Sequence, residues 1–171
     1  GGATRAWAGY RGSAKSECCA GRAGGGRFDA CPPSKYRITG KDAGAFLGCV
    51  LARDIRGCPP GQAQYTCWLD DRGFVIEDGV ILRPARDEFL LTAAEPNLAY
   101  FADLIGRERV AIEEVSEGFG VIAVQGPRSR DLLARLVPAV AGLPFFGLTQ
   151  GKIASVPLPI SPPGYRVILA H

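Results

Sequence analysis

Hydrophobic and polar residues follow regular spacings from residue 28 onward. Residues 36–39 alternate and predict a short strand that ends at Gly40. Apolar residues three and four positions apart then predict a helix within residues 41–51, with one face formed by Ala43, Phe46, Leu47, Val50 and Leu51. Pro59-Pro60-Gly61 follows and ends the regular pattern.

The middle of the chain predicts a hairpin. Two strand-like runs, residues 63–69 and 74–82, flank the sequence Asp70-Asp71-Arg72-Gly73, in which Gly73 supplies the positive φ that such a turn needs. Residues 88–93 predict a third strand of the same kind.

The second half repeats this alternation of helix and strand. One helix is predicted near Pro96, strands at residues 110–115 and 119–124, and a helix that begins at Pro127. Residues 152–160 are apolar but hold Pro157 and Pro159, which predicts an edge strand. The order β-α-β-β-β-α-β-β-α predicts an α+β fold, with helices packed on a largely antiparallel sheet.

Residues 1–27 differ from the rest. They are rich in glycine and arginine and have no hydrophobic period, which predicts a poorly ordered leader before a domain at residues 28–171. The leader also carries the charge excess: residues 1–30 hold five basic and two acidic residues, and the net charge of the whole chain is +3. Because a nucleic-acid-binding protein gathers its basic residues on a folded face, we expect no nucleic-acid partner.

Composition narrows the class further. The 171 residues contain no methionine, so we expect a fragment of a longer protein. The sequence has neither a signal peptide nor a long apolar run, so we expect a cytoplasmic protein with no membrane partner. The six cysteines include no C-x-x-C pair, so we expect reduced thiols and no metal site.

Five motifs go beyond composition. They are YRITGKDAGAFL at residues 36–47, PGQAQYT at 60–66, GFVIEDGVI at 73–81, VQGPRSR at 124–130 and LPFFG at 143–147. In this order they resemble the start of the glycine-cleavage T-protein (aminomethyltransferase) superfamily. PPSKY at residues 32–36 and LTAAEPNL at 91–98 look closest to its T-protein-like relatives, which include folate-dependent demethylases. The resemblance implies the folate-binding T-protein fold for residues 28–171, truncated before the rest of that fold.

The resemblance also implies a reaction, in which an aminomethyl or methyl group is transferred to tetrahydrofolate. The catalytic carboxylate would be Asp78, and tetrahydrofolate would bind Tyr65, Asp78, Val80 and Tyr165. A carboxylate at that place can hold the N10 side of the folate and manage protons and charge. The partners would be a small-molecule methyl or aminomethyl donor and a lipoyl carrier protein.

Ordinary structural roles remain open for the same residues. Asp78 could be a solvated acid at a strand edge, and Tyr65 could pack on a half-buried sheet. Because successive strand residues point to opposite faces, only one of Glu77 and Asp78 can face the folate, and we expect the other to be solvated. Ala94 stands where T-proteins carry a folate-contacting asparagine, so we expect Asn97 to be a turn or cap residue.

The C-terminal sequence departs most from the family pattern. Gly164-Tyr165 matches, but Pro162 replaces an arginine and the family's pterin-binding glutamate is not reached. Two alternatives therefore stay open: a non-catalytic folate-binding protein of the iron–sulfur assembly type, and an inactive truncated product. We also expect exposed apolar surface around Leu143, Phe145 and Phe146.

Overall fold

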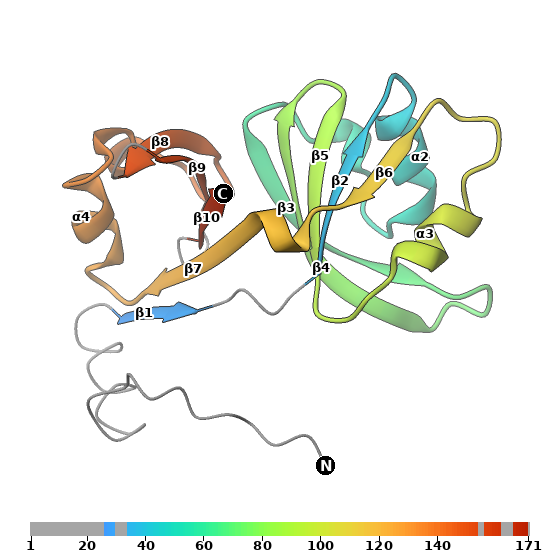
Figure 1. Ribbon diagram of the computed structural model, residues 1–171, viewed down its shortest axis with the longest axis horizontal. Coiled ribbons are helices and arrows are strands. Elements are labelled where there is room, and N and C mark those ends of the chain that lie inside the picture. Colours follow the sequence, from blue (N-terminus) through green and yellow to red (C-terminus); the bar gives the residue numbers. More distant parts are fainter. Residues whose placement is uncertain (1–25, 30–33, 154–155, 162–165, 171) are drawn as a thin grey trace, which may run out of the picture.

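The computed structural model describes residues 26–29, 34–153, 156–161 and 166–170. Their strands form two antiparallel five-stranded sheets, which stand side by side in Figure 1. The predicted α+β class is confirmed, and the strands are divided between two sheets rather than gathered in one.

The first sheet has the strand order β3-β4-β5-β2-β6. Its strands are β2 (Ser34–Thr39), β3 (Gln62–Leu69), β4 (Val75–Ala85), β5 (Glu88–Ala93) and β6 (Ala111–Glu114). The predicted hairpin is confirmed as β3 and β4, and Gly73 in its turn has a φ of +85°. The Asp70 carboxylate accepts backbone hydrogen bonds from Arg72 and Phe74, which closes this turn.

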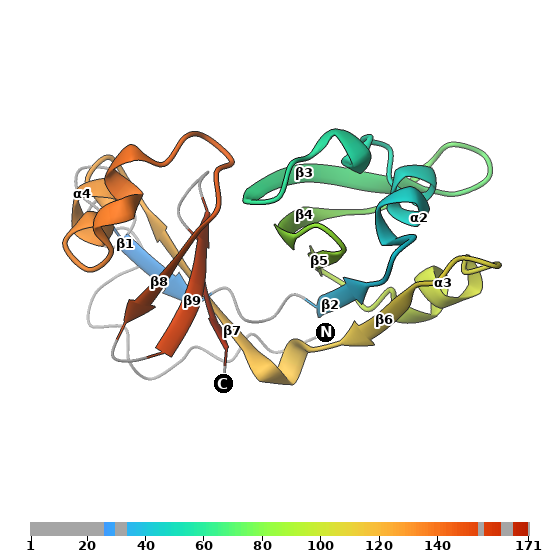
Figure 2. The ribbon, with the colours of Figure 1, turned by 90° about the horizontal axis from the view of Figure 1, so that it is seen from above.

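Helices cover one face of the first sheet, which we call the outer face. They are α2 (Ala43–Val50), α3 (Leu98–Asp103) and the short 3-10 helix η1 (Ile55–Gly57). Figure 2 shows α2 and α3 at the end of the molecule away from the second sheet. The core between helices and sheet contains the buried rings of Tyr36, Trp68, Phe89 and Phe101. Trp68 and Phe101 lie 5.2 Å apart between ring centroids.

The second sheet has the strand order β1-β7-β10-β9-β8. Its strands are β1 (Gly26–Asp29), β7 (Phe119–Gln125), β8 (Thr149–Ile153), β9 (Val156–Ser161) and β10 (Arg166–Ala170). The 3-10 helix η2 (Ser116–Gly118) links β6 to β7, and α4 (Ser129–Ala134) and η3 (Pro138–Gly142) follow β7. Val124, Leu133, Val137, Val140 and Ile160 form the core of this part.

A third cluster joins the two sheets. Its buried members are Ala63, Leu82, Leu90 and Val121, with partly buried neighbours that include Val80, Phe119 and Phe146. We call the face of the first sheet that contacts this cluster the inner face. The contact is reinforced by backbone pairing, because the segment after η3 reaches the start of β3 (Figure 2) and Gly147 forms a bridge with Gln62.

The prediction of one edge strand at residues 152–160 is wrong. This region contains parts of two strands, β8 and β9, and β9 lies inside the sheet between β8 and β10. The prolines fit there because, within β9, only Ile160 and Ser161 pair with β10, so the part of β9 with Pro157 and Pro159 has a partner on one side only.

Two further expectations need correction. Gly26 and Arg27 belong to the predicted leader but lie in β1, where they pair with Gln125 and Val124. The rest of the leader lies outside the described residues.

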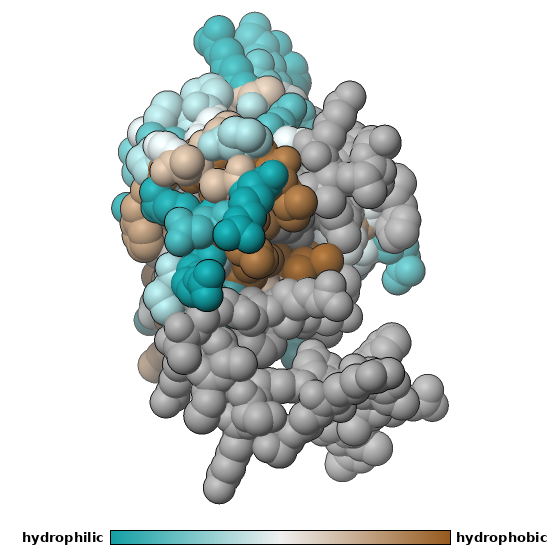
Figure 3. Space-filling view, turned by 90° about the vertical axis from the view of Figure 1, so that its left-hand side faces the viewer, coloured by the Kyte–Doolittle hydropathy of each residue, from teal (hydrophilic) through white to brown (hydrophobic). Residues whose placement is uncertain are grey.

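Leu143 was expected to be exposed but is buried, whereas Phe145 is 70% exposed as expected. Leu132 and Leu136, in and after α4, are more than half exposed, and Figure 3 shows hydrophobic surface on the side of the molecule where α4 lies.

Asp42 connects the start of α2 to the segment before β6. Its carboxylate accepts hydrogen bonds from the Arg109 backbone nitrogen at 3.0 Å and from the Arg109 Nε at 2.8 Å. These hydrogen bonds hold the pKa of Asp42 below its ordinary value. A carboxyl group with a lowered pKa in the folded state stabilises the fold above its unfolded-state pKa and loses that contribution as the pH falls.

We therefore expect Asp42→Asn to unfold at lower urea concentration than the wild type at pH 7. The difference should shrink as the pH falls below about 4, the ordinary pKa of an aspartate. Urea unfolding at pH 7 and pH 3 measures this, with the exposed Asp103→Asn as the control that changes little. A difference between Asp42→Asn and the wild type that is equal at both pH values would contradict the role given to Asp42.

Candidate functional site

The hairpin β3–β4 carries three of the four residues that the sequence indicated. Tyr65 on β3 lies opposite Val80 on β4, and Cys67 lies opposite Asp78. Side chains alternate along each strand, and Ala63, Leu82 and Val80 belong to the cluster between the sheets. Tyr65, Cys67, Asp78 and Val80 are therefore all on the inner face. The fourth residue, Tyr165, lies outside the described residues.

These residues differ in exposure. Tyr65 is 52% exposed, so about half of its surface is accessible. Asp78 and Val80 are half-buried. Within the described part of the chain, the Asp78 carboxylate accepts no hydrogen bond, whereas its own backbone nitrogen donates to Glu77. The hairpin thus presents an accessible ring, an apolar side chain and a carboxylate with free acceptor positions.

Glu77, the neighbouring acid, is half-buried and makes two hydrogen bonds to backbone nitrogens. Its side chain lies on the outer face, where Oε2 accepts a hydrogen bond from the Glu95 backbone nitrogen at 3.1 Å. Oε1 accepts another from the Asp78 backbone nitrogen, also at 3.1 Å. Glu77 therefore joins β4 to the segment that precedes α3, and the two neighbouring acids have different surroundings.

Asn97 stands at the start of α3, as expected of a cap residue, but its side chain does not cap the helix. Instead its Oδ1 accepts a hydrogen bond from the Trp68 indole nitrogen at 3.3 Å, and its Nδ2 donates to the Glu95 carbonyl oxygen. Its backbone nitrogen donates to the Tyr36 hydroxyl. Asn97 is thus part of a buried network on the outer face, on the side of the sheet opposite Asp78.

Sequence reasoning did not single out three inner-face neighbours of this site. Cys67 faces Asp78 across the hairpin, and its thiol is free. Thr92 on β5 lies opposite Val80, and its hydroxyl donates to the Val80 carbonyl oxygen at 3.2 Å. Lys35 on β2 lies opposite Thr92 and is buried. A strand register, which motifs alone do not provide, is the signal that would have found all three.

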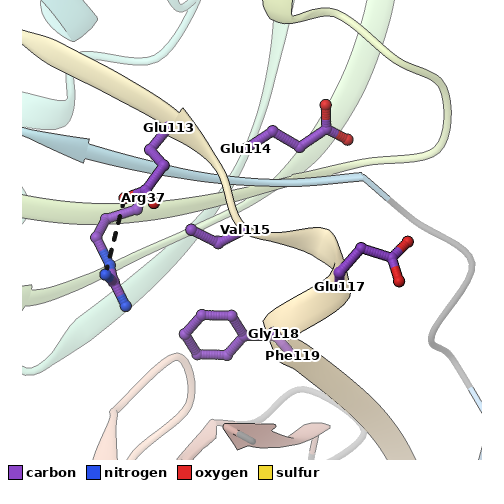
Figure 4. A pocket seen from close by; sticks show the side chains of 7 residues that line it. All are labelled: Arg37, Glu113, Glu114, Val115, Glu117, Gly118 and Phe119. Carbon is purple, nitrogen blue, oxygen red and sulfur yellow. Dashed lines mark ion pairs between the residues drawn. The ribbon is translucent and has the colours of Figure 1, made fainter.

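A separate pocket of about 350 Å³ lies where β6 leaves the first sheet and η2 leads to β7 (Figure 4). The Arg37 guanidinium lies 3.9 Å from a Glu113 carboxylate oxygen and 5.7 Å from the centroid of the Phe119 ring. In Figure 4 the side chains of Glu114 and Glu117 point away from this pair. Neither Asp78 nor Tyr65 lines this pocket.

A second pocket, of about 360 Å³, lies on the outer side among α2, α3 and the end of β3, and it is lined mainly by apolar residues. Among the described residues, no group of three or more potential ligand side chains could hold a metal ion, and no helix is long and apolar enough to cross a membrane.

Comparison with known proteins identifies the family. The family model of the GCVT N-terminal domain matches residues 5–167, so the chain belongs to this family, which is of the aminomethyltransferase type. An aminomethyltransferase of Exiguobacterium sibiricum is 32% identical over 158 residues, which are 90% of this chain and 44% of that relative. The chain thus spans less than half the length of this curated relative.

Solved structures agree on the fold. Glycine cleavage system aminomethyltransferase T from Bartonella henselae aligns with a TM-score of 0.78 and 22% identity, over 91% of this chain and 44% of that chain. A chain of the heterotetrameric sarcosine oxidase from Corynebacterium sp. U-96 aligns with a TM-score of 0.59 and 19% identity, over 91% of this chain and 82% of that one.

Gly79, between the two half-buried site residues, allows β4 to approach β5. A Cβ atom on Gly79 would stand 1.8 Å from the Thr92 carbonyl oxygen and 3.6 Å from the Trp68 ring.

We therefore expect Gly79→Ala to lower the free energy of unfolding by about 1–3 kcal/mol or more, because the backbone of β4 or β5 must move to make room for the methyl group. Urea unfolding measures the effect. Gly57→Ala is the control, since a Cβ there meets nothing within 4 Å, and equal stability of the two variants would disprove the close approach.

Proposed function

We propose that the chain forms the tetrahydrofolate-binding part of a one-carbon transferase that transfers an aminomethyl or methyl group. The observation that carries the proposal is the placement of Tyr65, Asp78 and Val80 together on the inner face of one hairpin. Family membership supports the reaction class, and the geometry supports which residues would take part.

The chemistry of this face suits a folate. A reduced folate offers a flat aromatic system and nitrogen atoms that accept a one-carbon unit. An exposed aromatic ring such as Tyr65 can stack on a flat ligand, and Val80 beside it offers an apolar contact. The Asp78 carboxylate, which no described residue engages, can accept a hydrogen bond from the ligand and so fix its orientation.

Asp78 can also act during the transfer itself. Positive charge develops on a folate nitrogen as the one-carbon unit is gained or lost, and a fixed, half-buried carboxylate stabilises that charge. The same carboxylate can hold the proton that the nitrogen releases. Glu77 keeps the strand in place through its hydrogen bond to Glu95, so we assign it a structural role.

The remaining participants follow from the same proposal. The donor would be a small molecule that carries a methyl or aminomethyl group, and a lipoyl carrier protein would present the aminomethyl group in a glycine-cleavage reaction. The cytoplasm is the expected location. Since the chain covers 44% of the aminomethyltransferase relative, turnover is tested on a longer protein and binding on this chain.

Tetrahydrofolate binding by calorimetry tests the proposal. We expect saturable binding to the wild-type chain and about tenfold weaker binding to Asp78→Ala, because the loss of one charge-assisted hydrogen bond costs roughly 1.5 kcal/mol. Asp78→Asn should fall between the two, since its amide oxygen still accepts a hydrogen bond but carries no charge.

Glu77→Gln is the matched control. It changes the neighbouring acid on the opposite face, so the unfolding midpoint should fall slightly while the affinity for tetrahydrofolate stays near the wild-type value. Equal weakening by Glu77→Gln and Asp78→Ala would show that the effect is general and contradict the role of Asp78. No binding to the wild type would refute the proposal for this chain.

A further inference from the structure

Thr92 on β5 contacts both residues that follow Asp78 along β4. Its carbonyl oxygen lies directly against Gly79, where a Cβ atom would stand 1.8 Å from it. Its hydroxyl donates a hydrogen bond to the Val80 carbonyl oxygen at 3.2 Å and accepts one from the Val80 backbone nitrogen at 3.3 Å. A threonine hydroxyl can do both, because it has one donor and two acceptor positions. One residue therefore holds two consecutive residues of β4.

The backbone of Asp78 lies just beyond this anchored stretch. Pairing of β4 with β5 begins at Gly79 and Ala93, so Asp78 is one residue outside it. On the other side, β3 pairs with Asp78 through Cys67. Each peptide unit is planar and leaves only two soft dihedral angles per residue, so a movement of Val80 is passed along the strand. The position of the Asp78 carboxylate thus depends on how firmly the next two residues are held.

Thr92 itself is covered. The four residues Tyr65, Val80, Thr92 and Lys35 lie opposite one another across β3, β4, β5 and β2. Tyr65 is 52% exposed and Val80 is half-buried, whereas Thr92 is 6% exposed and Lys35 is 1% exposed. The accessible part of this row therefore ends at Val80. Any influence of Thr92 on a ligand passes through the backbone of β4.

We propose that Thr92 is a positioning residue for the Asp78 carboxylate, and that it acts through the two hydrogen bonds between its hydroxyl and the Val80 backbone. This inference rests on the proposed function. A carboxylate that is held in place before the ligand arrives loses less freedom on binding than one that has to be ordered. Without the hydroxyl, part of the binding free energy would be used to order this stretch of β4.

Tetrahydrofolate binding by Thr92→Val, measured by calorimetry, tests the inference. Valine keeps the shape of the side chain and replaces the hydroxyl with a methyl group, so we expect about fivefold weaker binding. Thr92→Ser keeps the hydroxyl and should bind nearly as the wild type does. Thr39→Val is the matched control: it makes the same substitution on the same face of the sheet, opposite Glu88 at the other end of β5, and should leave the affinity unchanged.

A double-mutant cycle distinguishes positioning from a general loss of structure. If Thr92 acts through Asp78, Thr92→Val should weaken binding much less in a protein that already carries Asp78→Ala. A general loss of structure would weaken binding by the same factor in both backgrounds, and that result would overturn the inference. Circular dichroism at the temperature of the titration checks that each variant is folded.

The outcomes separate the two proposals. If the wild type does not bind tetrahydrofolate, the proposed function fails and this inference fails with it. If the wild type binds, Asp78→Ala binds more weakly and Thr92→Val binds as the wild type does, only the inference about Thr92 fails. Equal weakening by Thr92→Ser and Thr92→Val would show that the methyl group matters rather than the hydroxyl, and would also overturn it.

Discussion

The arrangement of this protein depends on the burial of β4 from both sides. Ile81 packs into the helix-covered core, while Val80 and Leu82 pack into the cluster between the sheets. A shift of β4 by one residue would move Val80 and Leu82 to the helix-covered side and Ile81 to the side between the sheets. Asp78 and Glu77 would also exchange sides, so the register is strongly fixed. The separate surroundings of the two neighbouring acids follow directly from this constraint.

Contacts at both ends of β3 support the same register. This strand is at the edge of its sheet, and exposed edges invite pairing with other chains. Leu51 forms a bridge with Trp68 near one end of β3, and Gly147 forms one with Gln62 at the other. The second of these contacts comes from the segment that follows η3, so the protection of an edge and the joining of the two sheets are achieved by the same residues.

Local patterns in the sequence predicted most elements, and long-range pairing explains what they missed. β5 was predicted with its observed bounds, because its hydrophobic residues and its flanking turns agree. β1, β9 and β10 depend on partners far along the chain, which a local pattern does not reveal. The candidate site was indicated by motif, yet its partners were not. A hairpin closed between Leu69 and Phe74 would set Asp78 opposite Tyr65. In the structure Leu69 pairs with Val75, and a further register shift between Trp68 and Leu69 sets Asp78 opposite Cys67.

The buried indole of Trp68 has an optical consequence. The ring lies within van der Waals reach of the Gly79 position, directly behind the strand that carries Asp78 and Val80. Its nitrogen donates to Asn97, and its surroundings are apolar and fully shielded from water. Its fluorescence emission should therefore be displaced to short wavelength. A displacement of β4 that changed these surroundings would alter that emission, so Trp68, which pairs with Glu77 next to Asp78, is a spectroscopic reporter of the strand that carries the proposed catalytic carboxylate.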